Sequence, residues 1–118
     1  MTVNRVVPNI ATEQMGAAKT FYGDLLGMTV AMDHGWIVTF MGGGQASPQI
    51  SFASEGGSGT PVPDFSIEVG DLADTHQRLI DAGYQVEYGP VTEPWGVRRF
   101  FVRDPFDRLL NLLSHEAV

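Results

Sequence analysis

The chain has 118 residues, no cysteine, and 14 acidic against 7 basic side chains, which gives a formal net charge of −7. The length predicts one compact domain, and the lack of cysteine excludes thiolate metal sites, thiol nucleophiles and disulfides. The acidic balance argues against a nucleic-acid partner and is compatible with a cationic ligand. No stretch has the roughly 20 apolar residues of a membrane span, and no signal peptide is recognisable, so we expect a cytoplasmic protein with no membrane partner.

The first half of the chain predicts one strand, one helix and three more strands. A strand over Val3–Ile10 precedes a helix over Glu13–Leu26. Thr12 is suited to cap this helix and Gly27 to end it. Apolar residues recur at steps of three and four through the helix, which predicts one buried stripe from Met15 to Leu26. The three later strands are expected near Val30–Asp33, Trp36–Met41 and Gln49–Phe52.

The second half predicts the same order of elements. It follows a segment rich in glycine, serine and proline, residues 54–63, which has the composition of a linker. The alternation of Phe65–Val69 indicates a strand, and a helix is expected over Leu72–Ala82, capped by Asp71 and ended by Gly83. Strands near Val86–Tyr88, Arg98–Arg103 and Leu109–Leu113 complete it.

A weak internal repeat relates the two halves. Gly83 lies 56 residues after Gly27, and Val86 lies 56 residues after Val30 (83 − 27 = 86 − 30 = 56). This spacing predicts two βαβββ modules within one domain over residues 1–118. Module one covers about 1–53 and module two about 64–118, with the linker between them.

Three segments of the chain resemble the vicinal oxygen chelate superfamily of glyoxalases, extradiol dioxygenases and bleomycin-resistance proteins. They are FYGDLLGMTV at Phe21–Val30, the strand and helix of Ile67–Val86, and the closing hairpin of Glu93–His115. The resemblance implies an α+β fold in which two βαβββ modules form an open cup-shaped mixed β-sheet with the helices outside. The family's closing turn usually has glycine where this chain has Asp107, and aspartate tolerates the left-handed conformation that such a turn needs.

The alternation of apolar and polar residues assigns the faces of most strands. The apolar residues of Phe65–Val69 are expected to meet the helix, which leaves Asp64, Ser66 and Glu68 facing the cup. By the same parity the inward residues of the other strands are Arg5, Val7, Asn9, Gln49, Ser51, Ala53, Leu109, Asn111 and Leu113. The strands around Trp36–Phe40 and Arg98–Arg103 are apolar on both faces, so their orientation stays open.

Enzymes of this superfamily hold a divalent metal at four inward positions, with histidine, glutamate or glutamine side chains. The resemblance places these positions at Val7, Ser51, Asp64 and Asn111. Valine cannot ligate a metal, and serine and asparagine are weak neutral donors. We therefore expect no metal, no other cofactor and no catalytic residue.

Four other ionisable residues could carry chemistry. The histidines, His34, His76 and His115, are expected to be packing or surface residues, with His76 on the apolar stripe of its helix. Glu93 precedes Trp95, and a carboxylate beside an indole is a weak indication of a general base. A solvated loop acid is the simpler interpretation of Glu93.

Large aromatic residues near the cup indicate a small-molecule site. The predicted ligand-binding residues are Val7, Trp36, Gln49, Ser51, Asp64, Glu68, Trp95, Phe101 and Asn111. The EPWG turn at Glu93–Gly96 is similar to one in bleomycin-resistance proteins, which sequester a drug at a dimer interface without a metal. We thus predict a homodimer that sequesters a drug or metabolite, cationic or aromatic, without catalysis. The alternatives are a metal-dependent lyase or dioxygenase with unrecognised ligands, and a structural or regulatory dimer with a vestigial cup.

Overall fold

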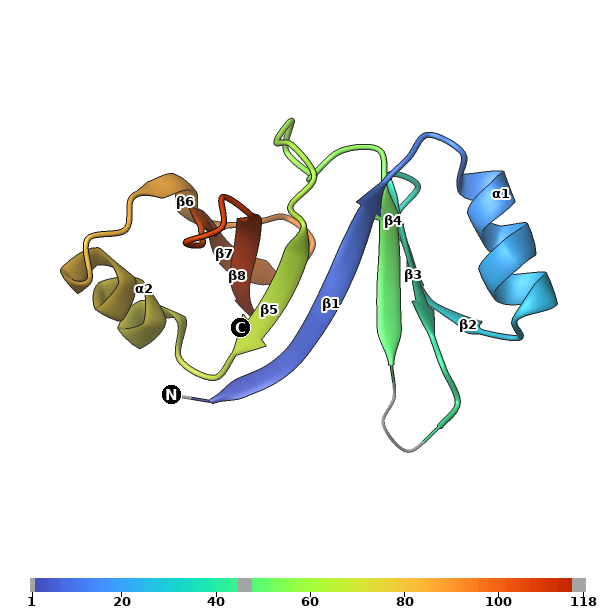
Figure 1. Cartoon of the computed structure of the whole chain (residues 1–118), viewed down its shortest axis with the longest axis horizontal. Helices are drawn as coiled ribbons and strands as arrows, with labels where there is room; N and C mark the ends of the chain where they lie inside the picture. The colour runs from blue at the N-terminus through green and yellow to red at the C-terminus, as the bar shows by residue number, and fades with distance from the viewer. Residues whose placement is uncertain (1, 45–47, 116–118) are drawn as a thin grey trace. The chain divides into compact units, whose positions relative to one another are not determined.

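The computed structural model describes residues 2–44 and 48–115, which form eight strands and two helical segments (Figure 1). The first helix, α1, continues directly into the π-helix η1. None of the described helices is long and apolar enough to cross a membrane. In chain order the elements are β1 (Val3–Ala11), α1 (Met15–Ala18), η1 (Lys19–Leu25), β2 (Thr29–Asp33), β3 (Ile37–Met41), β4 (Gln49–Ala53), β5 (Phe65–Val69), α2 (Leu72–Asp81), β6 (Val86–Thr92), β7 (Val97–Arg103) and β8 (Leu109–His115).

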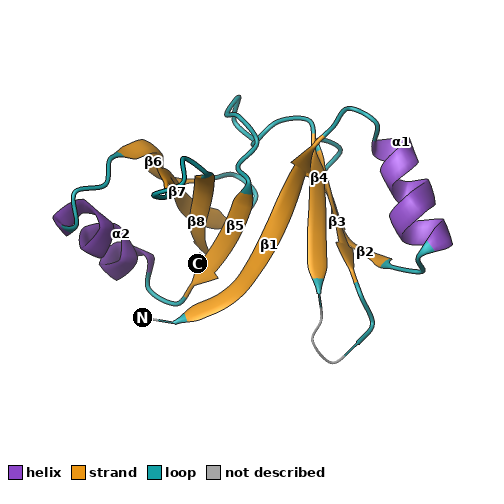
Figure 2. Ribbon diagram, viewed as in Figure 1, coloured by secondary structure: helices purple, strands orange, loops and turns teal. Residues whose placement is uncertain are grey.

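The chain divides into two compact units. The N-terminal unit is 7–62, and the C-terminal unit is 63–118 together with residues 1–6. Strand neighbours run β2-β3-β4-β1 in the first and β6-β7-β8-β5 in the second. In each, the strand that opens the βαβββ sequence pairs in parallel with the strand that closes it (β1 with β4, β5 with β8). The α+β architecture of two βαβββ modules is therefore confirmed, and each unit has its own helix and sheet (Figure 2).

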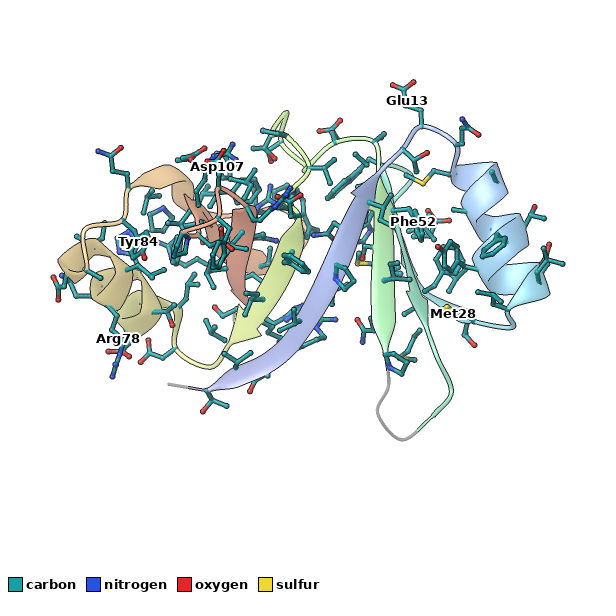
Figure 3. All side chains as sticks on the ribbon, viewed as in Figure 1. Glu13, Met28, Phe52, Arg78, Tyr84 and Asp107 are labelled. Carbon is teal, nitrogen blue, oxygen red and sulfur yellow. The ribbon has the colours of Figure 1, made fainter. Side chains whose placement is uncertain are left out.

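The core of the N-terminal unit lies between its helix and its sheet. Val38, Phe40 and Phe52 are buried there with Ala18, and Met28 packs against them (Figure 3). Val38 and Phe40 therefore face the helix, which settles the orientation of β3 that the sequence left open. The intervening residues point the other way, as the hydrogen bond between the hydroxyls of Thr39 and Ser51 (2.8 Å) shows.

The first helix begins later than predicted and changes its period. It starts at Met15, and Thr12 Oγ1 accepts a hydrogen bond from Gln14 N (3.0 Å). From Lys19 it is a π-helix, in which Leu26 N bonds the carbonyl five residues back (3.0 Å). This wider turn rotates the end of the apolar stripe out of the core, so that Leu26 is 58% exposed. The prediction of one buried stripe to Leu26 was wrong for that reason.

The second helix follows its prediction closely. The carboxylate of Asp71 caps α2 by accepting a hydrogen bond from Asp74 N (3.0 Å). Gly83, with φ +93°, ends it in the left-handed conformation that glycine adopts without strain. The helix end and turn that lead from Gly83 into β6 thus have the residues that their backbone requires.

The core of the C-terminal unit lies under α2. Val69, Leu72, Phe100 and Leu112 are buried there with Val102, and Tyr84 packs against the cluster (Figure 3). Phe100 and Val102 therefore face the helix, and the alternate residues of β7 point to the other side of the sheet. This result settles the second orientation that the sequence left open, and it decides where the arginines of β7 lie.

Two connections bear on the sequence predictions. Asp107 has φ +65°, as expected for the residue that replaces the family's glycine in the β7–β8 turn. Residues 54–63 form a hydrogen-bonded turn, in which Gly56 N donates to Thr60 O (2.8 Å). A Cβ on Gly56 would lie 2.1 Å from Pro61 O, so the close approach of the backbone requires glycine there.

Candidate ligand-binding site

One row of side chains crosses all four strands of the C-terminal sheet on the side away from α2. Ser66 in β5 is in register with Asn111 in β8, which pairs with Phe101 in β7, which pairs with Tyr88 in β6. Arg99 lies in the next row, opposite Leu113. We call the side that carries Ser66, Tyr88, Arg99, Phe101 and Asn111 the far face. It combines aromatic rings with polar groups, which is the usual composition of a small-molecule site.

Arg99 and Glu93 form a buried ion pair at one end of this face. Oε2 of Glu93 accepts from Arg99 Nη2 (2.6 Å), Arg99 Nε (2.8 Å) and Tyr88 Oη (3.0 Å). The guanidinium carbon lies 4.8–5.4 Å from the ring centroids of Phe101, Trp95 and Tyr88. Such cation–π contacts and charge-assisted hydrogen bonds fix the geometry of all five residues. The pair therefore holds the β6–β7 turn and the indole of Trp95 against the sheet.

Glu93 was predicted to be a solvated loop acid, and that prediction was wrong. The residue is only 5% exposed, because its carboxylate turns inward to Arg99. Three donors occupy one of its oxygens, so its main role is structural. The sequence places Glu93 and Arg99 on either side of the EPWG turn, and their opposite charges six residues apart in a hairpin were the available signal.

Asn111 has an unsatisfied polar atom in the middle of the far face. Its Nδ2 donates to Ser66 Oγ (3.1 Å), whereas its Oδ1 is buried and has no hydrogen-bond partner among the described residues. The residue is 7% exposed, and Phe101 lies beside it in register. Rotating the amide by 180° would exchange the two atoms and again leave one of them without a partner. A buried amide atom of this kind is satisfied by an ordered water molecule or by a ligand.

Comparison with known proteins identifies the family. Residues 2–112 match the family described as the Glyoxalase/Bleomycin resistance protein/Dioxygenase superfamily. The chain belongs to this superfamily. No curated protein matches the sequence.

Solved structures of similar fold come from several bacteria. A structure described as the NAD-dependent benzaldehyde dehydrogenase from Legionella pneumophila has a TM-score of 0.73 at 13% identity, covering 95% of this chain and 100% of that one. A superfamily member from Vibrio splendidus 12B01 has a TM-score of 0.67 at 18% identity (96% and 99% covered). The methylmalonyl-CoA epimerase of Streptomyces coelicolor has a TM-score of 0.71 at 18% identity (99% and 98% covered). At these identities the likeness establishes the fold alone.

The superfamily's four metal positions do not fit a divalent ion in this chain. Val7 offers no donor, and the Ser51 hydroxyl is hydrogen-bonded to Thr39 (2.8 Å). Asp64 is held by the backbone of β8: its N donates to Leu109 O (2.8 Å), and its Oδ2 accepts from Leu109 N (3.0 Å). Among the described residues there is no group of three or more histidine, aspartate or glutamate side chains that could hold a metal. A divalent ion needs several charged oxygens or imidazoles.

Glu68 lies in β5 within a chain of charged groups. Its Oε1 is 3.0 Å from Arg5 Nε, and its Oε2 is 2.8 Å from His115 Nδ1. Both carboxylate oxygens are thus engaged within the C-terminal unit. His115 is an exposed surface residue, and the ring of His76 packs edge-on against Phe100 (centroids 5.0 Å apart), as expected for both histidines.

The remaining predicted site residues lie in the N-terminal unit. Val7 is 4% exposed in β1, and Gln49 Nε2 lies 4.0 Å from Met41 Sδ. Trp36, just before β3, stacks on His34 with ring centroids 6.3 Å apart. Three other residues of the predicted set, Phe101, Trp95 and Asn111, share the far face or its edge. Val7, Trp36 and Gln49 belong to a separate unit.

The turn before Trp36 carries a perturbed carboxylate. Asp33 Oδ1 accepts from Gly35 N (2.9 Å), and Asp33 Oδ2 is 3.0 Å from Lys19 Nζ. The backbone hydrogen bond of Gly35, followed by the hydrogen bond and charge of Lys19, lowers the pKa of Asp33 below its ordinary value of 3.8. Both contacts favour the ionised carboxylate, which therefore anchors the turn to η1.

Proposed function

We propose that this superfamily member binds a small organic molecule on the far face, without a metal, and sequesters it rather than transforming it. The observation that carries the proposal is Asn111, whose buried Oδ1 has no donor within residues 2–44 and 48–115. Leaving a buried carbonyl oxygen without a partner costs about 1–3 kcal/mol. The atom is shielded from solvent in the free chain, and a ligand N–H or O–H group that reaches it on binding would offset this cost.

The surroundings of Asn111 support an aromatic or cationic ligand. The half-buried ring of Tyr88 supplies an aromatic surface, and Phe101, which is in register with Asn111 and only 1% exposed, lies behind it with ring centroids 5.2 Å apart. Trp95, held by Arg99, adds a second large ring at the edge of the face. The chain's net charge of −7 attracts a cation at long range. An ammonium or amide N–H group would match the acceptor at Asn111.

Binding of metal-free bleomycin, a cationic molecule rich in amides, tests the proposal. Asn111→Leu removes the acceptor at nearly constant volume, whereas Asn111→Asp keeps an oxygen there. Asn4→Leu, a change of an exposed asparagine in β1, is the matched control. We expect saturable binding by titration calorimetry in the wild type, Asn4→Leu and Asn111→Asp, and at least tenfold weaker binding in Asn111→Leu.

Two results would overturn the proposal. Equal bleomycin binding by Asn111→Leu and Asn4→Leu would show that the bleomycin site lies elsewhere. If neither bleomycin nor any of a panel of aromatic amines binds the wild type, the proposed ligand class is wrong. Elemental analysis of the purified protein tests whether the ligand is bound without a metal. Stoichiometric zinc, manganese, nickel or iron would contradict binding without a metal and favour a metal-dependent lyase or dioxygenase.

We also propose that the protein is a homodimer. In the strand order of the described residues, β2 and β6 lie at the two ends, and each has a hydrogen-bonded neighbour on one side only. Unpaired strand edges are commonly covered by a partner subunit. Sedimentation equilibrium should give about twice the chain mass of 12.8 kDa, and a mass near that of one chain at micromolar concentration would contradict the dimer.

A further inference from the structure

A cavity lies in the C-terminal unit, on the side of the sheet opposite the far face. Its volume is about 530 Å³, and it is bounded by the N-terminal half of α2 and by β7 and β8. This volume lies within the ordinary range for small-molecule sites. The residues that matter for its chemistry are Leu72, His76, Pro90, Arg98, Ser114 and His115.

Arg98 is the main charge in this cavity. Five of the seven basic residues form ion pairs with carboxylates in the part of the chain that the structure describes, and Arg98 and Arg108 do not. Arg98 makes one hydrogen bond, from Nη1 to Thr92 Oγ1 (3.1 Å). A guanidinium has five N–H donors. In a chain with 14 acidic side chains, a half-buried arginine without a carboxylate partner is unusual.

Two of the chain's three histidines line the same cavity. The imidazole of His76 packs against Phe100, and neither of its ring nitrogens has a hydrogen-bond partner among the described residues. His115 uses Nδ1 toward Glu68 (2.8 Å), which leaves its Nε2 as a further polar atom at the rim. Apart from the bond of Arg98 to Thr92, the side-chain nitrogens of Arg98 and His76 thus line one cavity without a hydrogen-bond partner in the part of the chain that the structure describes.

Asp71, the acidic residue of the cavity lining, does not form an ion pair with Arg98 or His76. Its carboxylate caps α2 by accepting from Asp74 N (3.0 Å), and its carbonyl accepts from Thr75 N (3.1 Å). The positive end of the α2 dipole also favours negative charge at this end of the helix. The described residues include no group of three or more histidine, aspartate or glutamate side chains that could hold a metal ion.

We propose that this cavity binds a small organic anion, whose carboxylate or phosphate group contacts Arg98 and His76. The planar guanidinium matches the two oxygens of such a group, and charge-assisted hydrogen bonds of this kind are roughly twice as strong as neutral ones. Leu72 and Pro90 supply apolar contacts for the body of the ligand. The site is separate from the far face, because Arg98 and Arg99 point to opposite sides of β7.

The test is an amide NMR titration of the full chain with two probes, inorganic phosphate and benzoate. The decisive variant is Arg98→Gln, and Arg108→Gln is the matched control, because it removes the same charge from a residue outside the cavity. We expect saturable shifts at Ala73, Gln77 and Ser114 in the wild type and in Arg108→Gln. Affinity should fall at least tenfold in Arg98→Gln. Stronger binding of phosphate or of benzoate identifies the preferred anion.

Shifts without saturation, or equal losses in Arg98→Gln and Arg108→Gln, would overturn the proposal, since both indicate nonspecific attraction. Thermal unfolding checks that each variant is folded. If Arg98→Gln does not fold, Arg98→Lys keeps the charge without the planar fork, and an unchanged affinity in that variant would also contradict the proposal. Bleomycin binding serves as the readout for the far face and should be unaffected by Arg98→Gln, so the two proposals fail separately.

Discussion

Arg99 and Glu93 face each other inside the protein, with Nη2 of Arg99 2.6 Å from Oε2 of Glu93 and each side chain 3% exposed. The rings of Tyr88, Trp95 and Phe101 surround the guanidinium and exclude water from it. In this environment neither charge has solvent as an alternative partner, so the two residues depend on each other.

Loss of one partner should therefore destabilise the fold strongly. Arg99→Met leaves the carboxylate of Glu93 buried without its cation, and we expect the free energy of unfolding to fall by about 3–5 kcal/mol. Arg103→Met is the control, because the Arg103–Glu87 pair (2.8 Å) is over 40% exposed on both sides and should contribute less than about 1 kcal/mol. Urea unfolding measures both changes. Equal losses of unfolding free energy in the two variants would show that burial of the ion pair does not increase its contribution to stability.

The positions of Ser51 and Asn111, which correspond in the two modules, should respond differently to loss of their polar groups. Ser51→Ala leaves the buried Thr39 hydroxyl without its partner at 2.8 Å, and we expect a loss of about 1–2 kcal/mol. Asn111→Leu removes the hydrogen bond from Nδ2 to Ser66 Oγ (3.1 Å), but it also removes a buried Oδ1 that has no partner among the described residues, so the two effects offset and the stability should change by less than about 1 kcal/mol. Thermal unfolding without ligand makes the comparison, and a large loss in Asn111→Leu would indicate that its amide serves the fold.

Two phenylalanines on either side of Arg103 test the placement of the core. Phe100 is 0% exposed under α2, whereas Phe106 is 81% exposed in the β7–β8 turn. We expect Phe100→Ala to lower the free energy of unfolding by about 3–5 kcal/mol, and Phe106→Ala to change it by less than about 0.5 kcal/mol. Comparable losses in chemical denaturation would contradict the orientation of β7.

The turn at Asp33 predicts a specific response to acid. The lowered pKa of Asp33 means that its carboxylate stabilises the folded state above the ordinary value of 3.8, and that this contribution is lost as the pH falls through the folded pKa. In Lys19→Met the pKa should rise only part of the way to 3.8, because the larger cause, the hydrogen bond from Gly35 N, remains. Carbon-detected NMR of the Asp33 carboxyl group during acid titration measures both values. A rise of the Asp33 pKa all the way to 3.8 in Lys19→Met would show that Lys19, and not the hydrogen bond from Gly35 N, is the larger cause of the lowered pKa.

Alternation and capping residues were sufficient to predict most of the fold. The Asp71 cap, the Gly83 stop and the faces of β4, β5 and β8 agree with the sequence, because each depends on neighbours within a few residues. The π-helix was missed because apolar residues at steps of three and four fit an α-helix equally well. Its wider turn is visible only in the backbone hydrogen bonds.

The candidate site was harder to predict, since it depends on strand register. Phe101 and Asn111 could be nominated one by one, but only the pairing of β7 with β8 brings them together. Strand β7 is apolar on both faces, so the sequence could not assign Arg98 and Arg99 to opposite sides of the sheet. The burial of Glu93 follows from that assignment, because its partner is the arginine on the far face.

Strand β1 divides between the two compact units, with Val6 in one and Val7 in the other. Within the C-terminal unit, Arg5 pairs with Glu68 (3.0 Å) and Gly70 N donates to Thr2 O (2.9 Å). After a protease cut in the turn of residues 54–63, the first six residues would remain covalently part of the N-terminal fragment while they pack in the C-terminal unit. The two pieces should stay associated without a covalent bond and co-elute on gel filtration, as a split protein whose halves complement each other.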